Sequence, residues 1–476
     1  MKKHSLLKFM GIILLLVLVA SYFIPARTGA VSYLPFGDLV TNYIQSYYYF
    51  FDTVVFLLAV GGFYGVLNKT GAYKKLLDSI VLKVKPMGTK FIFTIVIVFA
   101  IIGALTGFTT PLIVFIPFVI SIILLLGYDK LVAISSTIVS LLVGFIGGVF
   151  VSFRDPNSYY GFSATTFEVF TGADTHANLF PQLILLILGV VLLIMFINKH
   201  IKMVEDKKVK YELNDNSDIL ITEVKGNYKD IKTWPLIVIL CVMLVLLILG
   251  LLPWNSLFKI EVFNNFHTWI NGIAIKEFSI FGNIISSTFP AFGQWGELGN
   301  YMMLIVIMFI ATLIIKFVYR VKFDEVLDSI VEGAKKMLPT AMLMMLAYCI
   351  LVCTYNNGFI ETLITNVSSE GDINFVVASL ISIVGSLLHV DLYYTVAGVF
   401  TPILATVTED AMLPVFALSF QTLYGLVSII GPTSLLLIFA LSYLDVPYTT
   451  WLKYIWRFVL SLFIVIFAVL LIIALI

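Results

Sequence analysis

The chain has 476 residues, of which 60% are hydrophobic and only 12% are charged, and its formal net charge at pH 7 is +1. Soluble domains carry about half apolar and about a quarter charged residues. This composition therefore excludes a soluble protein and indicates an integral membrane protein with many spans in the lipid bilayer. No basic stripe with interleaved aromatic residues suggests a nucleic-acid partner.

The residues that usually carry enzyme chemistry are sparse. The three cysteines lie in apolar segments and predict neither a disulfide framework nor a metal site. The five histidines are scattered, and the chain has no glycine-rich loop for nucleotide phosphates. We therefore expect no enzyme, no bound metal and no cofactor other than a coupling Na⁺ or H⁺. Four arginines among many lysines and isoleucines indicate an AT-rich genome, and hence a bacterial plasma membrane.

The first part of the chain predicts two spans with a cytoplasmic N-terminus. Lys2 and Lys3 precede the apolar run Met10–Ile24, and basic residues favour the inner side of a membrane. A second span, Thr53–Leu67, returns the chain inward to six lysines between residues 69 and 90.

The segment Phe91–Tyr128 has no charge and is about twice the ~20 residues that one spanning helix needs. Its middle, GALTGFTTP, combines glycine, threonine and proline. The segment predicts either two full spans or a re-entrant hairpin that enters and leaves on one side. In the hairpin, Thr109 and Thr110 at the tip would contact the substrate.

The next span, Leu131–Val151, runs into a predicted helix break with the sequence VSFRDPNSYYGFS. Proline removes a backbone donor and disfavours helix in the preceding residue, and the freed groups at such breaks bind solutes in transporters. The break predicts substrate contacts from Arg154, Asn157 and Ser158, and an ion contact from Asp155. Alternatively, this stretch is a periplasmic turn in water.

A charged loop divides the chain. The span Pro181–Ile197 is followed by residues 198–233, whose eight lysines favour the cytoplasm. We therefore divide the chain into a first repeat (1–197), a cytoplasmic linker (198–233) and a second repeat (234–476).

The second half begins with three predicted spans, Trp234–Leu252, Tyr301–Ile315 and Met337–Val352. Between the first two, residues Pro253–Asn300 are amphipathic and rich in aromatics, which is typical of a segment lying along the membrane interface.

The stretch Phe375–Ala405 is the most informative in the chain. His389 and Asp391 lie in its apolar middle, where a carboxylate costs roughly 2.5–3.5 kcal/mol unless it has a partner, a proton or water. Glycines on both sides favour a second re-entrant hairpin that lines a site. We predict that Tyr394 and Thr395 bind substrate and that His389 and Asp391 couple the ion. Alternatively, both polar residues lie on an ordinary loop at the outer surface.

A second broken helix and a last span complete the chain. The run Met412–Tyr443 is too long for one simple span and is interrupted by glycine, proline, threonine and serine. Thr433 and Ser434 are predicted substrate contacts, and Gly431 is a predicted ion contact. The final helix is Phe458–Ile476.

The two halves share an order of elements: a hairpin, a broken helix and one unbroken helix. An extra span in the second half makes its hairpin enter from the opposite face, which predicts an inverted repeat with the site at the repeat interface. The predicted fold is an all-α polytopic membrane protein with two re-entrant hairpins, two broken helices and about ten transmembrane helices.

Three stretches resemble the YfcC-like family, which is related to the anaerobic four-carbon dicarboxylate carriers of the ion transporter superfamily. They are GGFYGVLNKTGA at Gly61–Ala72, GYDKLVAISSTIVSLLVGFIGG at Gly127–Gly148 and EGAKKMLPTAMLMMLA at Glu332–Ala347. The resemblance implies a scaffold domain that dimerises and an elevator-like movement of the transport domain. This chain departs from the family pattern at Tyr348–Cys349, at the hairpin tip His389–Asp391 and at Asp155–Asn157.

These observations predict a secondary active transporter, a symporter or exchanger, of a small charged solute such as an amino acid or a carboxylate. Helix N-termini at the breaks would supply positive potential to a substrate carboxylate. An acid and a base together in the predicted site, Asp391 and His389, favour a zwitterionic or cationic substrate over a plain dianion. The alternative functions are a lipid flippase and a non-transporting membrane scaffold.

Overall fold

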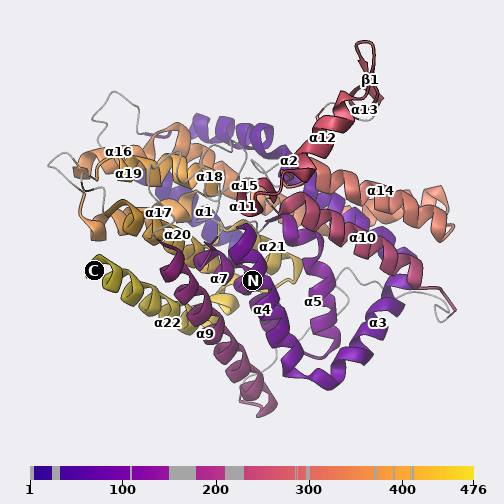
Figure 1. Ribbon diagram of the computed structural model, residues 1–476. Helices are drawn as coiled ribbons and strands as arrows, with labels where there is room; N and C mark the ends of the chain where they lie inside the picture. The colour runs from indigo at the N-terminus through magenta and orange to yellow at the C-terminus, as the bar shows by residue number, and fades with distance from the viewer. Residues whose placement is uncertain are drawn as a thin grey trace.

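The structure is a computed structural model of an almost entirely helical membrane protein with one short β-hairpin (Figure 1). It describes residues 5–23, 33–107, 110–149, 178–208, 230–252, 254–284, 286, 288–295, 301–368, 373–389, 392–407, 409 and 412–475.

The first half contains the elements up to α9. They are α1 (Ser5–Ser21), α2 (Phe36–Lys69), α3 (Ala72–Val84), η1 (Lys85–Met87), α4 (Thr89–Thr106), η2 (Thr110–Val114), α5 (Ile116–Leu125), α6 (Lys130–Ile134), η3 (Ser135–Val139), α7 (Ser140–Ile146) and α9 (Leu179–Glu205).

The second half begins at α10. Its elements are α10 (Trp234–Leu251), α11 (Trp254–Phe258), α12 (Val262–Gly272), β1 (Ala274–Ile275), β2 (Phe278–Ser279), α13 (Ile280–Ile284), α14 (Met302–Val318), α15 (Phe323–Asn356), α16 (Phe359–Val367), α17 (Phe375–Leu388), α18 (Leu392–Thr395), η9 (Val396–Phe400), α19 (Thr401–Leu404), α20 (Leu413–Ile430), α21 (Leu435–Tyr443) and α22 (Tyr448–Leu475).

The number of spans agrees with the sequence. In the part of the chain that the structure describes, seven helical segments are long and apolar enough to cross a membrane. Three further apolar segments, Ser5–Ser21, Lys130–Ile146 and Met302–Val318, reach 17 residues, the lower limit of about 17 for a span. The predicted all-α polytopic fold with about ten transmembrane helices is confirmed.

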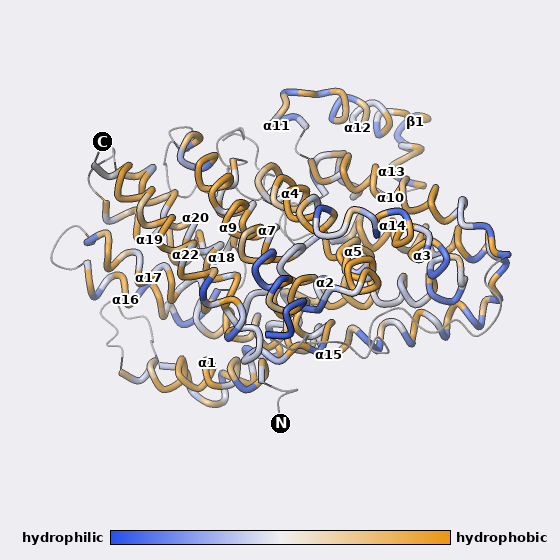
Figure 2. The backbone as a smooth tube through the Cα atoms, turned by 90° about the horizontal axis from the view of Figure 1, so that it is seen from below, coloured by the Kyte–Doolittle hydropathy of each residue, from blue (hydrophilic) through white to orange (hydrophobic). Residues whose placement is uncertain are grey.

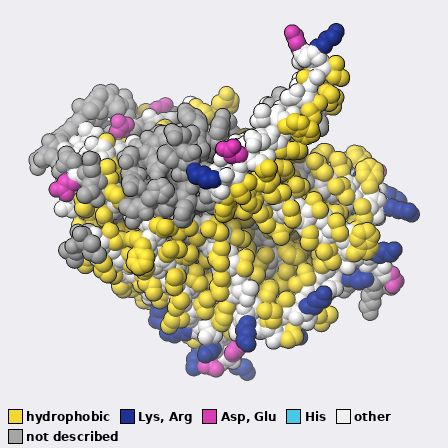
Figure 3. Space-filling model, viewed as in Figure 1, with side chains coloured by type: hydrophobic (Ala, Val, Ile, Leu, Met, Phe, Trp, Pro, Cys, Tyr) yellow, Lys and Arg dark blue, Asp and Glu magenta, His cyan; other side chains and the backbone are white. Residues whose placement is uncertain are grey.

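The surface carries the hydrophobic belt that a bilayer requires. Figure 2 shows hydrophobic residues along most of the helical trace, with hydrophilic residues in short connections and at helix ends. In Figure 3, hydrophobic side chains cover much of the visible face, and lysine and arginine gather toward its lower and right-hand edges. The arm formed by α12, β1, β2 and α13 projects away from the helices (Figure 1).

Two helices are much longer than predicted. The helix α2 begins at Phe36, well before the predicted span Thr53–Leu67, and it has a kink at Phe50. Its Asn42, Ser46 and Phe50 are buried at a spacing of four residues, so they form one helical face. This face packs on α15, and the packing extends α2 beyond its apolar core. The helix α15 likewise continues through Pro339 over 34 residues.

The close crossing of α2 and α15 depends on glycine. Gly61 and Gly65 have the small-xxx-small spacing that lets membrane helices approach closely. A Cβ atom at Gly61 would lie 2.4 Å from the Gly333 carbonyl oxygen, and one at Gly65 would lie 2.1 Å from the Ser329 carbonyl oxygen. The two backbones are therefore in direct contact, and no side chain fits between them.

We expect Gly333→Ala to destabilise the protein by about 1–3 kcal/mol, the usual cost of overpacking. Its Cβ would lie 2.0 Å from the Gly61 carbonyl oxygen, so the helices must separate. Thermal unfolding in detergent measures the effect. Gly11→Ala in α1 is the matched control, because nothing lies within 4 Å of the added Cβ. Equal melting temperatures for the two variants would contradict the glycine-dependent crossing.

The same pattern of helix pairs occurs in both halves. In the first half α7 packs on α4 and α9, and in the second half α20 packs on α17 and α22. Equivalent elements also meet across the halves, because α7 contacts α20 and α9 contacts α22. This pairing is what two related units around a common interface predict. The domain boundaries stay a prediction, and the proposed start of the linker at residue 198 falls inside α9.

Candidate functional site

The second predicted hairpin has two short arms that pack on each other. The helix α17 has 14 residues, about 21 Å at 1.5 Å per residue, which is less than the ~30 Å hydrocarbon core. The chain returns through α18, η9 and α19. A Cβ at Gly385 would lie 2.6 Å from the Val399 side chain, so the arms touch at this level.

Backbone and side-chain hydrogen bonds close the tip of this hairpin. The Thr395 hydroxyl donates to the His389 carbonyl oxygen at 3.0 Å, and the His389 Nδ1 lies 3.3 Å from the Tyr394 carbonyl oxygen. His389 is 1% exposed and Thr395 is fully buried. Asp391 lies outside the described residues. The turn thus holds the imidazole in a fixed orientation inside the protein.

The other ring nitrogen of His389 has no hydrogen-bond partner among the described residues. Because a carbonyl oxygen only accepts, Nδ1 carries a hydrogen, and in the neutral ring Nε2 is then an acceptor. This Nε2 is buried without a hydrogen bond in the part of the chain that the structure describes. A buried polar group without a partner is costly, so the orphaned nitrogen indicates a place where a proton or a ligand binds.

The break of the second broken helix lies directly against this hairpin. As predicted, the helix is interrupted at residues 431–434, between α20 and α21. The backbone of Gly431 is extended, and the Thr433 hydroxyl donates to the Leu387 carbonyl oxygen at 2.6 Å. Leu387 is two residues before His389. The predicted residues Gly431, Thr433, His389 and Thr395 therefore belong to one connected region.

The half-helix α21 presents its N-terminus at the break. Ser434 is its N-cap residue, and its side chain makes no capping hydrogen bond. The first amide groups of a helix lack intrahelical partners, and the helix dipole places partial positive charge there. The nine-residue α21 therefore directs positive potential toward the break, with the Ser434 hydroxyl not used for capping.

The carbonyl oxygens that end α20 are already hydrogen-bonded. Trp451 in α22 donates its indole N–H to the Ile429 carbonyl oxygen at 3.0 Å, and the Tyr448 hydroxyl donates to that of Ile430. We expected freed carbonyls at the breaks to act as ligands. At these two positions, an ion would have to share the oxygens with protein donors.

The first break begins earlier than predicted. The helix expected over Leu131–Val151 ends at Ile146, with Gly147 as its C-cap. A Cβ at Gly147 would lie 2.5 Å from the Leu186 backbone nitrogen, so the backbone of α9 passes this glycine closely. The close contact therefore requires a residue without a side chain at position 147.

A buried glutamine that the sequence analysis missed holds this break. The Gln421 amide nitrogen lies 3.0, 3.4 and 3.1 Å from the carbonyl oxygens of residues 145, 146 and 148. The Gln182 amide donates to the Gln421 Oε1 at 3.2 Å. A large polar side chain within an apolar run was the available signal, because such groups are expensive in a membrane unless they are bonded. The pair connects α7, α9 and α20.

Aromatic rings separate the hairpin from the long helices. The Tyr394 ring lies 5.2 Å from the Tyr355 ring and 5.7 Å from the Phe50 ring. Phe50, at the α2 kink, stacks on Tyr348 at 3.8 Å. We refer to these four rings as the aromatic wall. The predicted substrate residue Tyr394 thus packs against α2 and α15.

Of the remaining predicted residues, the structure describes only Thr110. Thr110 begins η2 and is half-buried. The others lie outside the described residues; they are Thr109, Arg154, Asp155, Asn157 and Ser158. Within the described ranges, no group of three or more His, Cys, Asp or Glu could hold a metal ion.

Comparison with known proteins points to a carrier family. The family model of the C4-dicarboxylate anaerobic carriers matches residues 10–475. An uncharacterized protein of Haemophilus influenzae is 25% identical over 107 residues, 22% of this chain and 21% of that protein. The match spans about a fifth of that curated relative. The crystal structure of the Alcanivorax borkumensis YdaH transporter aligns over 98% of this chain and 97% of its own, with 16% identity and a TM-score of 0.41.

Proposed function

The chain belongs to the C4-dicarboxylate anaerobic carrier family and is a membrane transporter, not an enzyme, and we propose that it is a secondary active transporter of small carboxylates. The substrate class that we propose comprises four-carbon dicarboxylates and amino acids, both of which carry a carboxylate. The observation that carries the proposal is the buried, unpartnered Nε2 of His389 beside a helix break.

The described groups at the break suit a carboxylate. The N-terminus of α21 and the Ser434 hydroxyl supply hydrogen-bond donors and positive potential. A protonated His389 Nε2 would add a charge-assisted hydrogen bond. We further propose Arg154, Asn157 and Ser158, from the first half of the chain, as substrate contacts.

We propose that His389 links substrate binding to a proton. The neutral ring offers only an acceptor at Nε2, so a carboxylate is bound favourably after this nitrogen is protonated. A buried imidazolium without an anion is costly, so the proton and the carboxylate stabilise each other. Asp391 and Asp155 are the proposed sites for a coupling Na⁺ or a second proton.

We propose an elevator-like movement in which the hairpins and broken helices move against α2 and α15. The aromatic wall supports this division, because at Tyr394 the hairpin meets the long helices through ring packing. The rest of the proposal places a homodimeric protein in a bacterial plasma membrane, with its N-terminus in the cytoplasm.

Uptake into proteoliposomes tests the function. Radiolabelled four-carbon dicarboxylates and amino acids are supplied with an imposed proton gradient, a sodium gradient or neither. We expect one substrate class to accumulate with the proton gradient and an ionophore to abolish the accumulation. Protein-free liposomes are the control.

Two other outcomes would count against the proposal. Substrate exchange without gradient-driven accumulation would indicate an exchanger without ion coupling. If no solute moves but fluorescent lipids cross the bilayer, the protein is a flippase. The lipid measurement uses the same vesicles, so both results come from one folded, inserted preparation.

A further inference from the structure

A cavity lined by neither the second hairpin nor the break at residues 431–434 lies between α9 and α22. It has a volume of about 520 Å³. Its walls come mainly from the C-terminal half of α9 and the N-terminal half of α22, which pack on each other. Neither the hairpin tip nor the break at residues 431–434 contributes to it. The transport proposal therefore gives this cavity no role.

One part of the cavity wall is apolar and aromatic. The Phe196 ring lies 4.8 Å from the Tyr454 ring and 5.6 Å from the Phe458 ring. At the rim, Met195 is 63% and Trp456 is 51% exposed. These two side chains are on the outer surface of helices that span the membrane, so the cavity opens sideways toward lipid.

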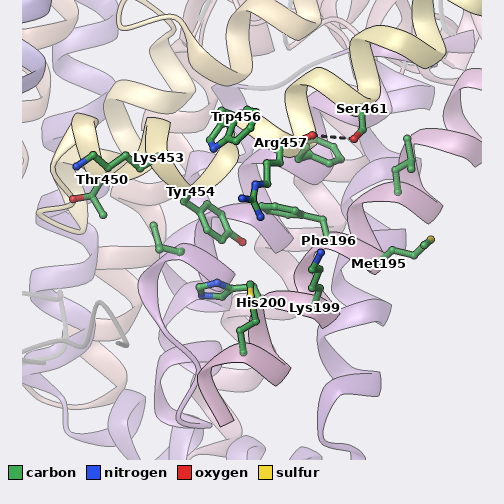
Figure 4. A pocket seen from close by; sticks show the side chains of 14 residues that line it. Met195, Phe196, Lys199, His200, Thr450, Lys453, Tyr454, Trp456, Arg457 and Ser461 are labelled. Carbon is green, nitrogen blue, oxygen red and sulfur yellow. Dashed lines mark hydrogen bonds between the residues drawn. The ribbon is translucent and has the colours of Figure 1, made fainter. Parts of the chain in front are cut away.

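The other part of the wall carries three cations. Lys199 comes from α9, and Lys453 and Arg457 come from α22. Figure 4 shows Lys199 and Arg457 reaching toward the same space between the helices, with Lys453 beyond Tyr454. The Arg457 guanidinium lies 5.3 Å from the Trp456 ring. None of the three forms a salt bridge within the described part of the chain.

The acidic group that is bonded to this wall does not neutralise the cations. Asp129 is fully buried, and its carboxylate bonds to the cavity residue His200 at 2.8 Å and to the Val132 amide at 2.8 Å. The Asp129 carboxylate is therefore already hydrogen-bonded inside the protein. The cavity keeps an excess of positive charge next to an apolar surface.

The cations lie at the depth of lipid headgroups. In α9 the residues 179–196 are uncharged and Lys199 follows them; in α22 the uncharged residues 458–475 follow Arg457. Each uncharged run has the length of about one bilayer core. The charges therefore stand where the hydrocarbon region ends, on the side of the lysine-rich segment that follows α9.

We propose that this cavity binds one anionic phospholipid of the cytoplasmic leaflet. The headgroup phosphate lies between Lys199 and Arg457, where guanidinium and ammonium groups donate charge-assisted hydrogen bonds. Lys453 contacts the remainder of the headgroup. An acyl chain follows the apolar rim at Met195 and Phe196. Basic pockets between transmembrane helices on this side of the membrane are typical phospholipid sites.

Native mass spectrometry of the full-length protein tests the site. The protein is released from detergent with added cardiolipin, phosphatidylglycerol or phosphatidylcholine, and the bound lipids are counted. We expect cardiolipin and phosphatidylglycerol to remain bound and phosphatidylcholine to dissociate. In K199Q/K453Q/R457Q, the retained anionic lipid should fall about tenfold or more. The single variant R457Q gives the same readout if the triple variant does not fold.

The matched control is K83Q/K85Q/K90Q, which removes three exposed cations outside this cavity. An equal loss of lipid in the control would show that general charge attraction holds the lipid, and would overturn the site. Equal retention of cardiolipin, phosphatidylglycerol and phosphatidylcholine would also overturn the site. If glycerol 3-phosphate displaces the lipid at equal concentration, the cavity is a site for a free phosphate and not for a lipid.

Discussion

Replacing His389 with alanine is expected to lower the initial rate of proton-driven uptake by at least about tenfold, because a hydrogen bond to a charged group contributes roughly 1.5–3 kcal/mol. The variant removes the nitrogen that has no protein partner, together with the contact to the Tyr394 carbonyl oxygen. Fluorescence-detected size-exclusion chromatography establishes that the variant is folded before its uptake is compared.

Two conservative variants separate the functions of the two nitrogens. In His389→Asn, the amide can take the place of Nδ1 and keep the bond to the hairpin, but it does not reach the position of Nε2. In His389→Gln, the longer side chain reaches the position of Nε2. We expect uptake to be lost in the asparagine variant and partly kept, without dependence on the proton gradient, in the glutamine variant.

The matched control is His267→Ala, because His267 lies in the projecting arm and bonds the Phe289 carbonyl oxygen. It should transport at the wild-type rate. If His389→Asn transports like the wild type with an unchanged pH profile, then Nδ1 is the important nitrogen and His389 only shapes the hairpin. That result would remove the proton from the proposed mechanism.

Replacing Gln421 with methionine is expected to cause the largest loss of stability among the variants considered. Methionine has a similar length but no donor, so the carbonyl oxygens of residues 146 and 148 lose this partner, whereas that of residue 145 still accepts from the Gly148 N–H. Each buried polar group left without a partner costs about 1–3 kcal/mol. For two such groups we expect about 2–6 kcal/mol in total, together with loss of transport, since the end of α7 is released.

Gln182→Met is the control for this prediction, because it removes the bond to the Gln421 Oε1 and leaves the three carbonyl contacts of Gln421 in place. The loss of stability in this control should be clearly smaller, about 1 kcal/mol. Unfolding in increasing dodecyl sulfate compares both variants with the wild type. If the two variants lose equal stability, the three carbonyl contacts carry no weight, and the stabilisation comes from the glutamine pair alone.

The sequence predicted elements whose signals are local. The interruption at residues 431–434 is confirmed because glycine and proline act on their own neighbours. The last spans of each half were found because long uncharged runs have few alternatives in a membrane. Within the site, His389, Thr395 and Thr433 lie in one connected region, as the polar residues in apolar surroundings suggested.

Features that depend on distant contacts could not be read from the sequence. The extension of α2 to Phe36 depends on burial against α15, far away in the chain. The early end of α7 depends on the approach of α9 at Gly147. The contacts of Gln421 depend on the packing of α20 beside α7, and one glutamine in an apolar helix does not reveal its partner. The re-entrant character of Phe91–Tyr128 and of Phe375–Ala405 stays a prediction.

The backbone contact between α2 and α15 has a consequence for biosynthesis. Residues 70–322 separate these helices in the chain, so α2 reaches the membrane long before its partner is made. At ~5–20 residues per second, the interval from Lys69 to Asn356 takes about 15–60 s. During this time, the glycine face of the nascent α2 borders lipid or the insertion machinery. Assembly of the two helices is therefore a late, post-insertion event. In nascent chains that stop before Phe323, the glycine face of α2 lacks its partner helix.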